Sequence, residues 1–251
     1  MEAQDVTIHC MVRDEINTIA YALASTAPYA KKILVTDTGS TDGTRELLTE
    51  LLIKLDTPFE LTFDNNVPDS RDYRFIGNHL QRNFDAHGEI IRVRNEHIQK
   101  TDTSWCWVVD GDEVYTEQAV TEMFELWRLV KNTMCCVFVP FQHFVMDLQH
   151  TTPEGPKHYG RLFKTDQLTV RPGDLGFEYH YYGEMFLMPS SPNTVRARMA
   201  PVQHYQLVYK PWRRQVRLKE PFKGSTAEVF WWKHLHDLVE KYRNPKYERI
   251  Q

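Results

Sequence analysis

Apolar residues in the first half of the chain switch repeatedly between the spacing of strands and the spacing of helices. Short apolar runs typical of strands occupy residues 6–12, 32–36 and 59–63. A helix that opens at Asp14 and that Pro28 ends is predicted by the spacing of Ile16, Ile19, Ala20 and Leu23. A second helix is predicted by Leu47, Leu48, Leu51, Leu52 and Leu55. Strands and helices that alternate with short links are typical of parallel βαβ units.

The same alternation continues through the middle of the chain. Helical spacing recurs at Ile90, Ile91, Arg94, His97 and Ile98, and a compact apolar strand follows at residues 105–109. Another helix is expected after Thr116, with inward-facing Val120, Met123, Phe124, Trp127 and Val130. Beyond Cys135, short aromatic-rich strands are separated by Pro and Gly, and a helical tail begins at about Thr226. We expect one α/β domain over residues 1–251, with a Rossmann-like, mostly parallel central sheet flanked by helices.

The composition is that of an ordinary globular protein, with 41% hydrophobic and 25% charged residues. A formal net charge of -4 argues against a surface built as a whole to bind nucleic acid. No apolar run approaches the ~20 residues of a spanning helix, and the acidic, polar start lacks the features of a secretory signal. The four cysteines form no CxxC pair, so buried reduced thiols are expected. These features predict a cytoplasmic protein without a membrane span.

Acidic residues follow two of the predicted strands. Asp37 comes directly after the second strand, and Asp110-Gly111-Asp112 comes directly after the strand at 105–109. Because ligands of open α/β sheets bind outside the carboxyl ends of the strands, both acidic segments are expected on one edge of the sheet. Two carboxylates separated by one glycine suit a hard divalent cation, Mn²⁺ or Mg²⁺, that keeps positions open for phosphate oxygens. A plain turn or a calcium loop is the alternative.

Four ordered elements resemble the opening half of family 2 glycosyltransferases with the GT-A fold. They are Val6-Thr-Ile-His-Cys-Met-Val-Arg-Asp-Glu15, Asp37-Thr-Gly-Ser-Thr-Asp-Gly-Thr44, Arg94-Asn95 and Ser104-Trp-Cys-Trp-Val-Val-Asp-Gly-Asp-Glu113. In the second half, Arg161-Leu-Phe-Lys164 and His204-Tyr205 are the recognisable pieces. The resemblance implies a GT-A fold with a nucleotide-sugar half (1–115), an acceptor-side extension (116–225) and the helical tail (226–251).

The resemblance implies a role for each matching residue at the nucleotide edge. Asp37 would accept a hydrogen bond from the nucleobase, typically from uracil N3–H. Asp112 would be the direct cation ligand, Asp110 would contact the ribose or the cation, and a distant His204 would complete the metal site. For His204 the alternative is a core histidine tied to a backbone carbonyl. Arg94 would reach the diphosphate or hold the acidic segment. The nucleotide-sugar pocket would be lined by Arg13, Glu15, Asp37, Ser40, Arg94, Asp110 and Gly111.

The resemblance also implies inversion of the anomeric centre by single displacement. Such a reaction needs a general base that removes the proton of the acceptor hydroxyl. The candidates are the carboxylates and histidines after Pro172, namely Asp174, Glu178, His180 and Glu184, and the choice among them is open.

A basic run with one tryptophan lies further along, at residues 210–219, and includes Trp212, Arg213 and Arg214. A solvated helix face is the ordinary explanation for such a run. The sharper interpretation is a site for the leaving diphosphate or for a phosphate-rich acceptor, and basic groups interleaved with aromatic ones also suit a nucleic-acid backbone.

Together these features predict a metal-assisted glycosyltransferase. It would move a sugar from a nucleoside diphosphate sugar, UDP being favoured, to a hydroxyl of a glycan, a lipid-linked sugar or a protein. The first alternative is a glycosyltransferase that modifies DNA bases, although a nucleic-acid partner is not favoured. The second is a non-catalytic module that binds nucleotide sugar or glycan, which would tend to lose the metal ligands. A nucleotidyltransferase usually has a Gly-rich loop after the first strand, and residues 11–15 contain no glycine.

Overall fold

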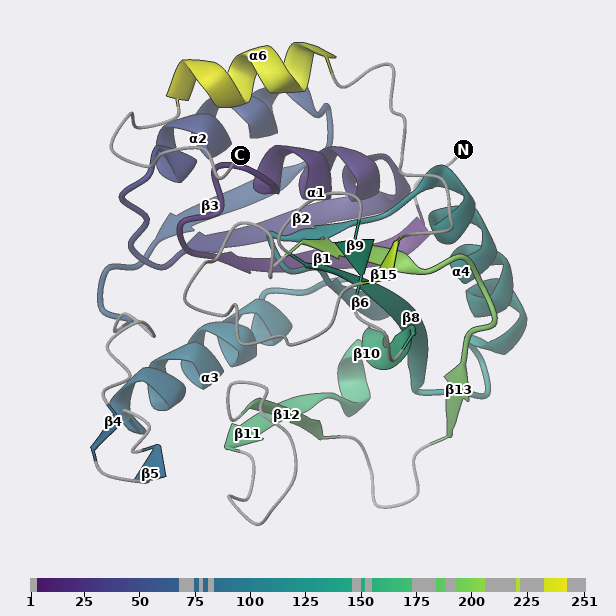
Figure 1. The fold of residues 1–251 in the computed structure, drawn as a ribbon. Helices are drawn as coiled ribbons and strands as arrows, with labels where there is room; N and C mark the ends of the chain where they lie inside the picture. Colours follow the sequence, from purple (N-terminus) through teal and green to yellow (C-terminus); the bar gives the residue numbers. More distant parts are fainter. Residues whose placement is uncertain are drawn as a thin grey trace.

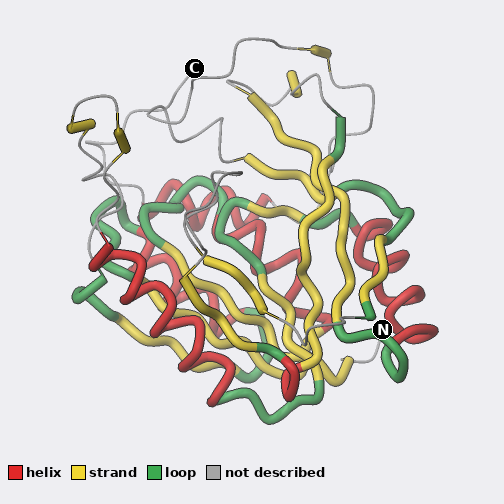
Figure 2. The backbone as a smooth tube through the Cα atoms, turned by 90° about the horizontal axis from the view of Figure 1, so that it is seen from below, coloured by secondary structure: helices red, strands yellow, loops and turns green. Residues whose placement is uncertain are grey.

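The computed structural model describes residues 4–67, 75–76, 79–80, 84–145, 150–151, 155–172, 184–187, 193–205, 220–221 and 233–242. A twisted sheet lies at the centre, with helices on both of its faces (Figure 1). Figure 2 shows the strands running side by side, with helices on either side of them.

Four parallel strands form the half of the sheet that the sequence predicted most directly. In spatial order they are β3 (Phe59–Phe63), β2 (Ala30–Asp37), β1 (Gln4–Val12) and β6 (Trp105–Val108). The connecting helices are α1 (Ile19–Thr26), α2 (Thr44–Lys54) and α3 (Phe84–Gln99). A 3-10 turn, η1 (Ala27–Tyr29), leads from α1 into β2. The predicted α/β fold with a mostly parallel central sheet is therefore confirmed.

Further strands extend the sheet beyond β6. An antiparallel pair follows it, β10 (Lys157–Lys164) and then β8 (Cys136–Val145). β8 also pairs in parallel with β13 (Thr194–Arg196) and β14 (Val202–Tyr205). β14 in turn pairs antiparallel with β7 (Glu113–Val114). The remaining strands of this sheet are β9 (His150–Thr151) and β15 (Glu220–Pro221).

Two hairpins and three further helices complete the part of the chain that the structure describes. The hairpins are β4 (Phe75–Ile76) with β5 (His79–Leu80), and β11 (Thr169–Pro172) with β12 (Glu184–Leu187). The helices are α4 (Glu117–Val130), the 3-10 helix η3 (Thr165–Gln167) and α6 (Lys233–Tyr242). Thr116 caps α4, since its hydroxyl accepts a hydrogen bond from the N–H of Ala119.

The two-residue period of the central strands sorts their side chains between two layers. Even-numbered residues of β1 and odd-numbered residues of β6 pack in the main core with the buried sides of α1, α2 and α4. The alternate residues of β1 face the opposite layer, where Met11 packs against buried residues of α3. His9 and His97 meet there edge to face, with ring centroids 5.4 Å apart. Burial lowers the pKa of both imidazoles, that of His97 to about 3, so both are neutral.

The first helix begins at Ile19, so the prediction that Asp14 opens it was wrong. The reason is local, because Asp14 has a positive φ of 52° and its N–H bonds to the Ser40 hydroxyl rather than starting a helix. Within the predicted helical tail the structure describes one helix, α6, which packs on α1 and α2 at the top of Figure 1. Lys241 and Tyr242 of α6 both bond to Glu50 of α2. The division of the chain into a nucleotide half, an acceptor half and a tail stays a prediction.

All four cysteines are buried, as the sequence predicted, and each is a free thiol in the structure. In the part of the chain that the structure describes, no helix combines the length and the apolar composition needed to cross a membrane.

Candidate functional site

The carboxyl ends of β1, β2 and β6 meet at one edge of the sheet. Val12 pairs with Asp37 in the β1–β2 ladder, and His9 pairs with Val108 in the β1–β6 ladder. Because the strands are parallel and in register, the segments that follow them start side by side. The structure therefore places Asp37 on the same edge as the acidic loop, by which we mean residues 110–113.

The loop after β2 binds main-chain groups of the turn after β1. Three successive N–H groups, those of residues 14, 15 and 16, donate to the side chains of Ser40 (2.8 Å), Thr44 (2.9 Å) and Asp42 (3.0 Å), respectively. Burial raises the pKa of Asp42, and its bonds to Thr44 oppose that rise. Ser40, which the resemblance placed in the nucleotide pocket, thus joins two turns within the protein.

Asp37 is fully buried and its two carboxylate oxygens differ in their contacts. Oδ1 accepts hydrogen bonds from the N–H groups of Gly39 (3.0 Å) and Ser40 (3.1 Å) and from Arg45 Nε (2.6 Å). Oδ2 is also buried, and it accepts no hydrogen bond from any residue that the structure describes. A buried acceptor without a donor is costly, so Oδ2 is suited to receive a donor from a ligand.

Arg13 covers the turn that follows Asp37. Its Nη1 donates to the carbonyl of Val67 at 2.9 Å. Gly39 has a φ of 109°, and a Cβ placed on it would lie 3.3 Å from the Arg13 guanidinium. The positive φ favours glycine here, and a Cβ would also push the Arg13 guanidinium aside by a few tenths of an ångström.

Asp110 lies between two arginines from other elements. Arg94 of α3 donates to Oδ1 at 2.9 Å, and Arg161 of β10 donates to Oδ2 at 3.2 Å. Burial acts to raise the pKa of this carboxyl, but the charges of Arg161 and Arg94 outweigh it, and the pKa is lowered. Of the two roles predicted for Arg94, the structure shows a contact that holds the acidic loop.

Glu113, the last residue of the acidic loop, is fully buried and binds Arg161. Arg161 Nε donates to Oε2 at 3.0 Å, and Nη2 donates to Oε1. Burial raises the pKa of Glu113 to about 7, although the Arg161 guanidinium opposes the rise. Arg161 therefore links two carboxylates of the acidic loop to β10.

Gly111 lies against the side chain of Glu15. A Cβ on Gly111 would be 2.9 Å from Glu15 Cγ and 3.3 Å from Val12 Cγ2. Glu15 is itself buried, and its Oε2 accepts a hydrogen bond from the Thr18 hydroxyl at 3.3 Å. Glycine is thus needed at position 111 because the turn after β1 packs directly on the acidic loop.

Asp112 faces a histidine from the far end of the chain. His204 Nε2 lies 3.3 Å from Asp112 Oδ1, and both side chains are nearly buried. Burial acts to lower the pKa of His204, but the Asp112 carboxylate outweighs it, and the pKa is raised. His204 Nδ1 contacts His143 Nδ1 at 2.6 Å, so the alternative of a histidine tied to a backbone carbonyl is not what the structure shows.

Two of the three predicted metal ligands, Asp112 of the acidic loop and His204 of β14, face each other. A carboxylate oxygen and an imidazole nitrogen are suitable donors for a divalent cation. Among the described residues, no group of three His, Cys, Asp or Glu side chains is arranged as a metal site. Asp110, the third predicted ligand, is bound by two arginines. Asp112 and His204 fit a cation whose other positions are filled by substrate phosphates and water.

Several candidates fall outside the described residues. These are Asp174, Glu178 and His180 among the bases, and Trp212, Arg213 and Arg214 of the basic run. For Glu184, the first residue of β12, the structure describes the backbone but not the side chain. The roles of these residues stay predictions.

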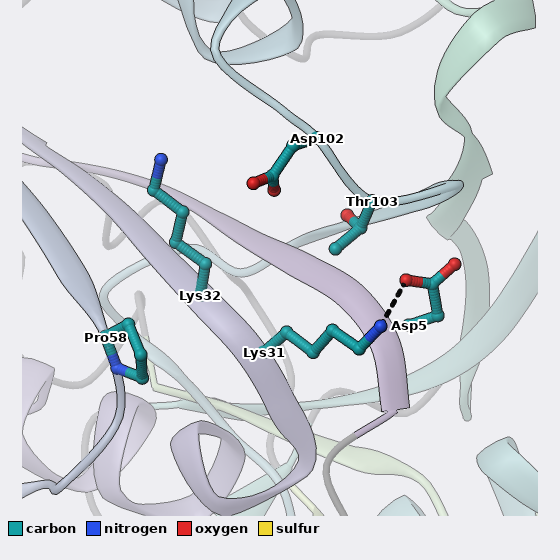
Figure 3. Close-up of a pocket in the computed structure, with 6 residues that line it drawn as sticks. All are labelled: Asp5, Lys31, Lys32, Pro58, Asp102 and Thr103. Carbon is teal, nitrogen blue, oxygen red and sulfur yellow. Dashed lines mark hydrogen bonds and ion pairs between the residues drawn. The ribbon is translucent and has the colours of Figure 1, made fainter.

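A surface pocket of roughly 430 Å³ lies at the opposite, amino-terminal ends of the strands (Figure 3). Lys31 and Lys32 line it together with Asp5 and Asp102, and Lys31 is paired with Asp5 at 2.8 Å. The two lysines and the two aspartates of this pocket balance in charge. The length of the strands separates the pocket from Asp37 and the acidic loop.

Four residues of the assembled site were not in the predicted set. Arg45 directly follows the loop after β2, and in the structure it binds Asp37. A basic residue this close to Asp37 in sequence was a signal that sequence reasoning did not use. Arg161 was noticed within its motif but given no role. Glu113 likewise stood within a quoted motif without a role. His143 carries no sequence signal of its own, because its contact with His204 arises only when β8 pairs with β14.

A parallel βαβ core with an acidic loop at its carboxyl edge is the class of fold that binds ligands outside its strand ends. The model of the family described as "Glycosyl transferase family 2" matches residues 10–182, more than half of the chain. The chain therefore belongs to glycosyl transferase family 2 and is a glycosyltransferase, which confirms the resemblance seen in its motifs.

Solved structures that resemble the chain are distant. TarS residues 1–349 from S. aureus, crystallised alone and in complex with UDP, match with a TM-score of 0.42 and 12% identity, over 64% of this chain and 47% of that one. Glucosyl-3-phosphoglycerate synthase from Mycobacterium tuberculosis, in complex with Mn²⁺, UDP-glucose and phosphoglyceric acid, matches with a TM-score of 0.34 and 14% identity, over 56% and 43%. The chain thus spans less than half the length of either. No curated protein matches it significantly.

Proposed function

We propose that the chain transfers a sugar from a UDP-sugar to an acceptor hydroxyl, with inversion and with the help of a divalent cation. The observation that carries the proposal is the meeting of Asp37, Asp110 and the Asp112–His204 pair on one edge of the sheet. This edge offers a donor nucleotide separate contacts for its base, its ribose and its diphosphate. The acceptor is a glycan, a lipid-linked sugar or a protein.

Asp37 is the proposed contact of the nucleobase. Its Oδ2 is buried without a donor among the described residues, while Oδ1 is held by three donors. A carboxylate only accepts hydrogen bonds, so it matches the N3–H of uracil and is mismatched to the bare N3 of cytosine. UDP is favoured over CDP for this reason.

Asp110 is better suited to the ribose than to the cation. Its charge is already neutralised by Arg94 and Arg161, and two guanidinium groups would repel a cation at the same oxygens. A carboxylate held in this way still accepts hydrogen bonds from ribose hydroxyls.

Asp112 and His204 are the proposed protein ligands of the cation. A set that includes an imidazole favours Mn²⁺ over Mg²⁺, because Mg²⁺ prefers oxygen ligands. When bound, the cation acts as a Lewis acid that neutralises the charge developing on the leaving diphosphate. The acceptor hydroxyl loses its proton to a base, for which Asp174, Glu178, His180 and Glu184 remain the candidates.

Hydrolysis of the donor by water tests this function without knowledge of the acceptor. A panel of nucleotide sugars is incubated with the wild-type chain, with and without EDTA, and products are measured by mass spectrometry. We expect hydrolysis of a UDP-sugar that falls by roughly 100-fold or more with EDTA and in Asp112→Asn. The matched control is Asp102→Asn at the opposite edge, which should retain full activity. Hydrolysis at the same rate with and without EDTA would contradict the proposed role of the cation. A preference for CDP-sugars would contradict the proposed role of Asp37.

A further inference from the structure

Two buried histidines lie side by side next to the acidic loop. β14 pairs with β8 in a register that sets His204 opposite His143, and their Nδ1 atoms are 2.6 Å apart. His204 Nε2 faces Asp112 at 3.3 Å, and His143 Nε2 lies 3.5 Å from the Tyr159 hydroxyl. The four side chains form a continuous series of polar contacts from Asp112 to Tyr159.

This series is enclosed by protein. His204 and His143 are only 5% and 6% exposed. The ring of Phe141 packs edge to face against His204, at 5.9 Å, and against Tyr159, at 5.2 Å. Because so little water reaches the imidazoles, each ring nitrogen has to find its partner within the series.

The short contact between the two Nδ1 atoms couples the tautomers of the two rings. A nitrogen–nitrogen distance of 2.6 Å requires one proton between them, so one Nδ1 donates and the other accepts. When neutral His204 carries its proton on Nδ1, its Nε2 is bare and the proton of His143 is on Nε2. When His143 instead donates from Nδ1, the proton of His204 is on Nε2, facing Asp112.

Only the first of these arrangements suits a metal ligand. A cation binds to a bare ring nitrogen, and the hydrogen bond made by the other nitrogen selects which one is bare. With Nε2 of His204 directed at the cation, Nδ1–H of His204 must donate to His143. His143 then donates from Nε2 toward the Tyr159 oxygen.

We propose that His143 is a positioning residue for the cation site: its bare Nδ1 accepts the Nδ1–H of His204 and thereby leaves His204 Nε2 free to bind the cation beside Asp112. Tyr159 supports the arrangement as the acceptor for Nε2–H of His143. The inference rests on the proposed function and deepens it, since it explains how a histidine enclosed by aromatic rings is held as a ligand.

Two variants of equal shape separate the hydrogen bond from packing. Asn at position 143 keeps an acceptor oxygen close to the place of Nδ1, whereas Leu has the same branching without any polar atom. Mn²⁺ binding to the full chain in the presence of UDP is measured by loss of the free-ion electron paramagnetic resonance signal. We expect His143→Leu to weaken Mn²⁺ binding by roughly 10- to 100-fold and His143→Asn to stay within about threefold of wild type.

The same titrations identify each way in which the inference fails. UDP binding without metal should be equal in all three chains, which shows that the nucleotide edge is intact. If His143→Leu binds Mn²⁺ as wild type does, or if both variants lose equal affinity, His143 is not the acceptor and the proposal is overturned. A wild-type chain that binds no Mn²⁺ with UDP overturns the cation site itself, which is a distinct result.

The tautomers can also be observed in the wild-type chain, without any substitution. Imidazole nitrogen spectra of the ¹⁵N-labelled protein are recorded with UDP, before and after saturation with diamagnetic Mg²⁺. We expect protons on Nδ1 of His204 and on Nε2 of His143 in the loaded chain. A proton on Nε2 of His204 in the loaded chain would overturn the proposal.

Discussion

The two acidic segments at the carboxyl edge of the sheet are held in place in different ways. The loop after β2, residues 37–44, is fixed by hydrogen bonds to main-chain groups of the adjacent turn after β1. The acidic loop is fixed by side chains from three other elements: the guanidinium groups of Arg94 in α3 and Arg161 in β10, and the imidazole of His204 in β14. The first segment thus depends on one neighbouring turn, and the second depends on several elements, of which β10 and β14 come late in the chain.

The difference also concerns charge. Asp37 has one cationic partner, Arg45, and most of its remaining contacts are neutral N–H groups. The acidic loop brings three carboxylates close together, and Arg161 is the contact shared by two of them. We therefore expect substitutions in the acidic loop to cost stability as well as function, and substitutions at Asp37 to change chiefly ligand preference.

The largest effect is expected from Arg161→Gln. This change removes the ion-pair partner of the fully buried Glu113 and one of the two arginines on Asp110, so both carboxylates lose their shared countercharge. Removing one member of a buried ion pair costs about 3–5 kcal/mol of the free energy of unfolding. Urea unfolding followed by tryptophan fluorescence measures the loss. The exposed Arg128→Gln on α4 is the control, with a change below about 0.5 kcal/mol. Equal unfolding midpoints for the two variants would mean that the acidic loop does not depend on Arg161.

Sequence reasoning was sufficient for the parallel half of the sheet and for the position of both acidic segments. The short apolar runs of β1 and β6 and the leucine spacing of α2 are local signals, and the structure confirms the strands and the helix that they predicted. It was insufficient for partners such as His143 and Glu113. Their environment is created by strand pairings between residues far apart in the chain, which no local spacing encodes. The start of α1 was missed because the positive φ of Asp14 depends on Ser40, in another turn.

A smaller effect, confined to ligand choice, is expected from Asp37→Asn. The amide oxygen can keep the three hydrogen bonds of Oδ1, which directs the NH₂ group to the place of Oδ2. That group clashes with uracil N3–H but can donate to the bare N3 of cytosine. Calorimetry should show UDP affinity falling by roughly 10- to 100-fold, a loss of about 1–3 kcal/mol, while the ratio of CDP to UDP affinity rises. Equal losses for both nucleotides would indicate a general disturbance of the loop instead of base recognition.

The smallest substitution, Gly111→Ala, tests the contact between the acidic loop and the turn after β1. In Gly111→Ala the new methyl group would lie 2.9 Å from Glu15 Cγ, so either the acidic loop or the turn after β1 has to shift. Overpacking of this kind costs about 1–3 kcal/mol of the free energy of unfolding.

The matched control is Gly88→Ala in α3, where an added Cβ meets no atom within 4 Å. Alanine is the better helix former, so this control should gain about 0.5–1 kcal/mol. Opposite signs in urea unfolding, with Mn²⁺ affinity reduced only in Gly111→Ala, would show that the turn after β1 supports the acidic loop. If Gly111→Ala is as stable as wild type and binds Mn²⁺ normally, the two segments are independent, and the acidic loop is held by its charged partners alone.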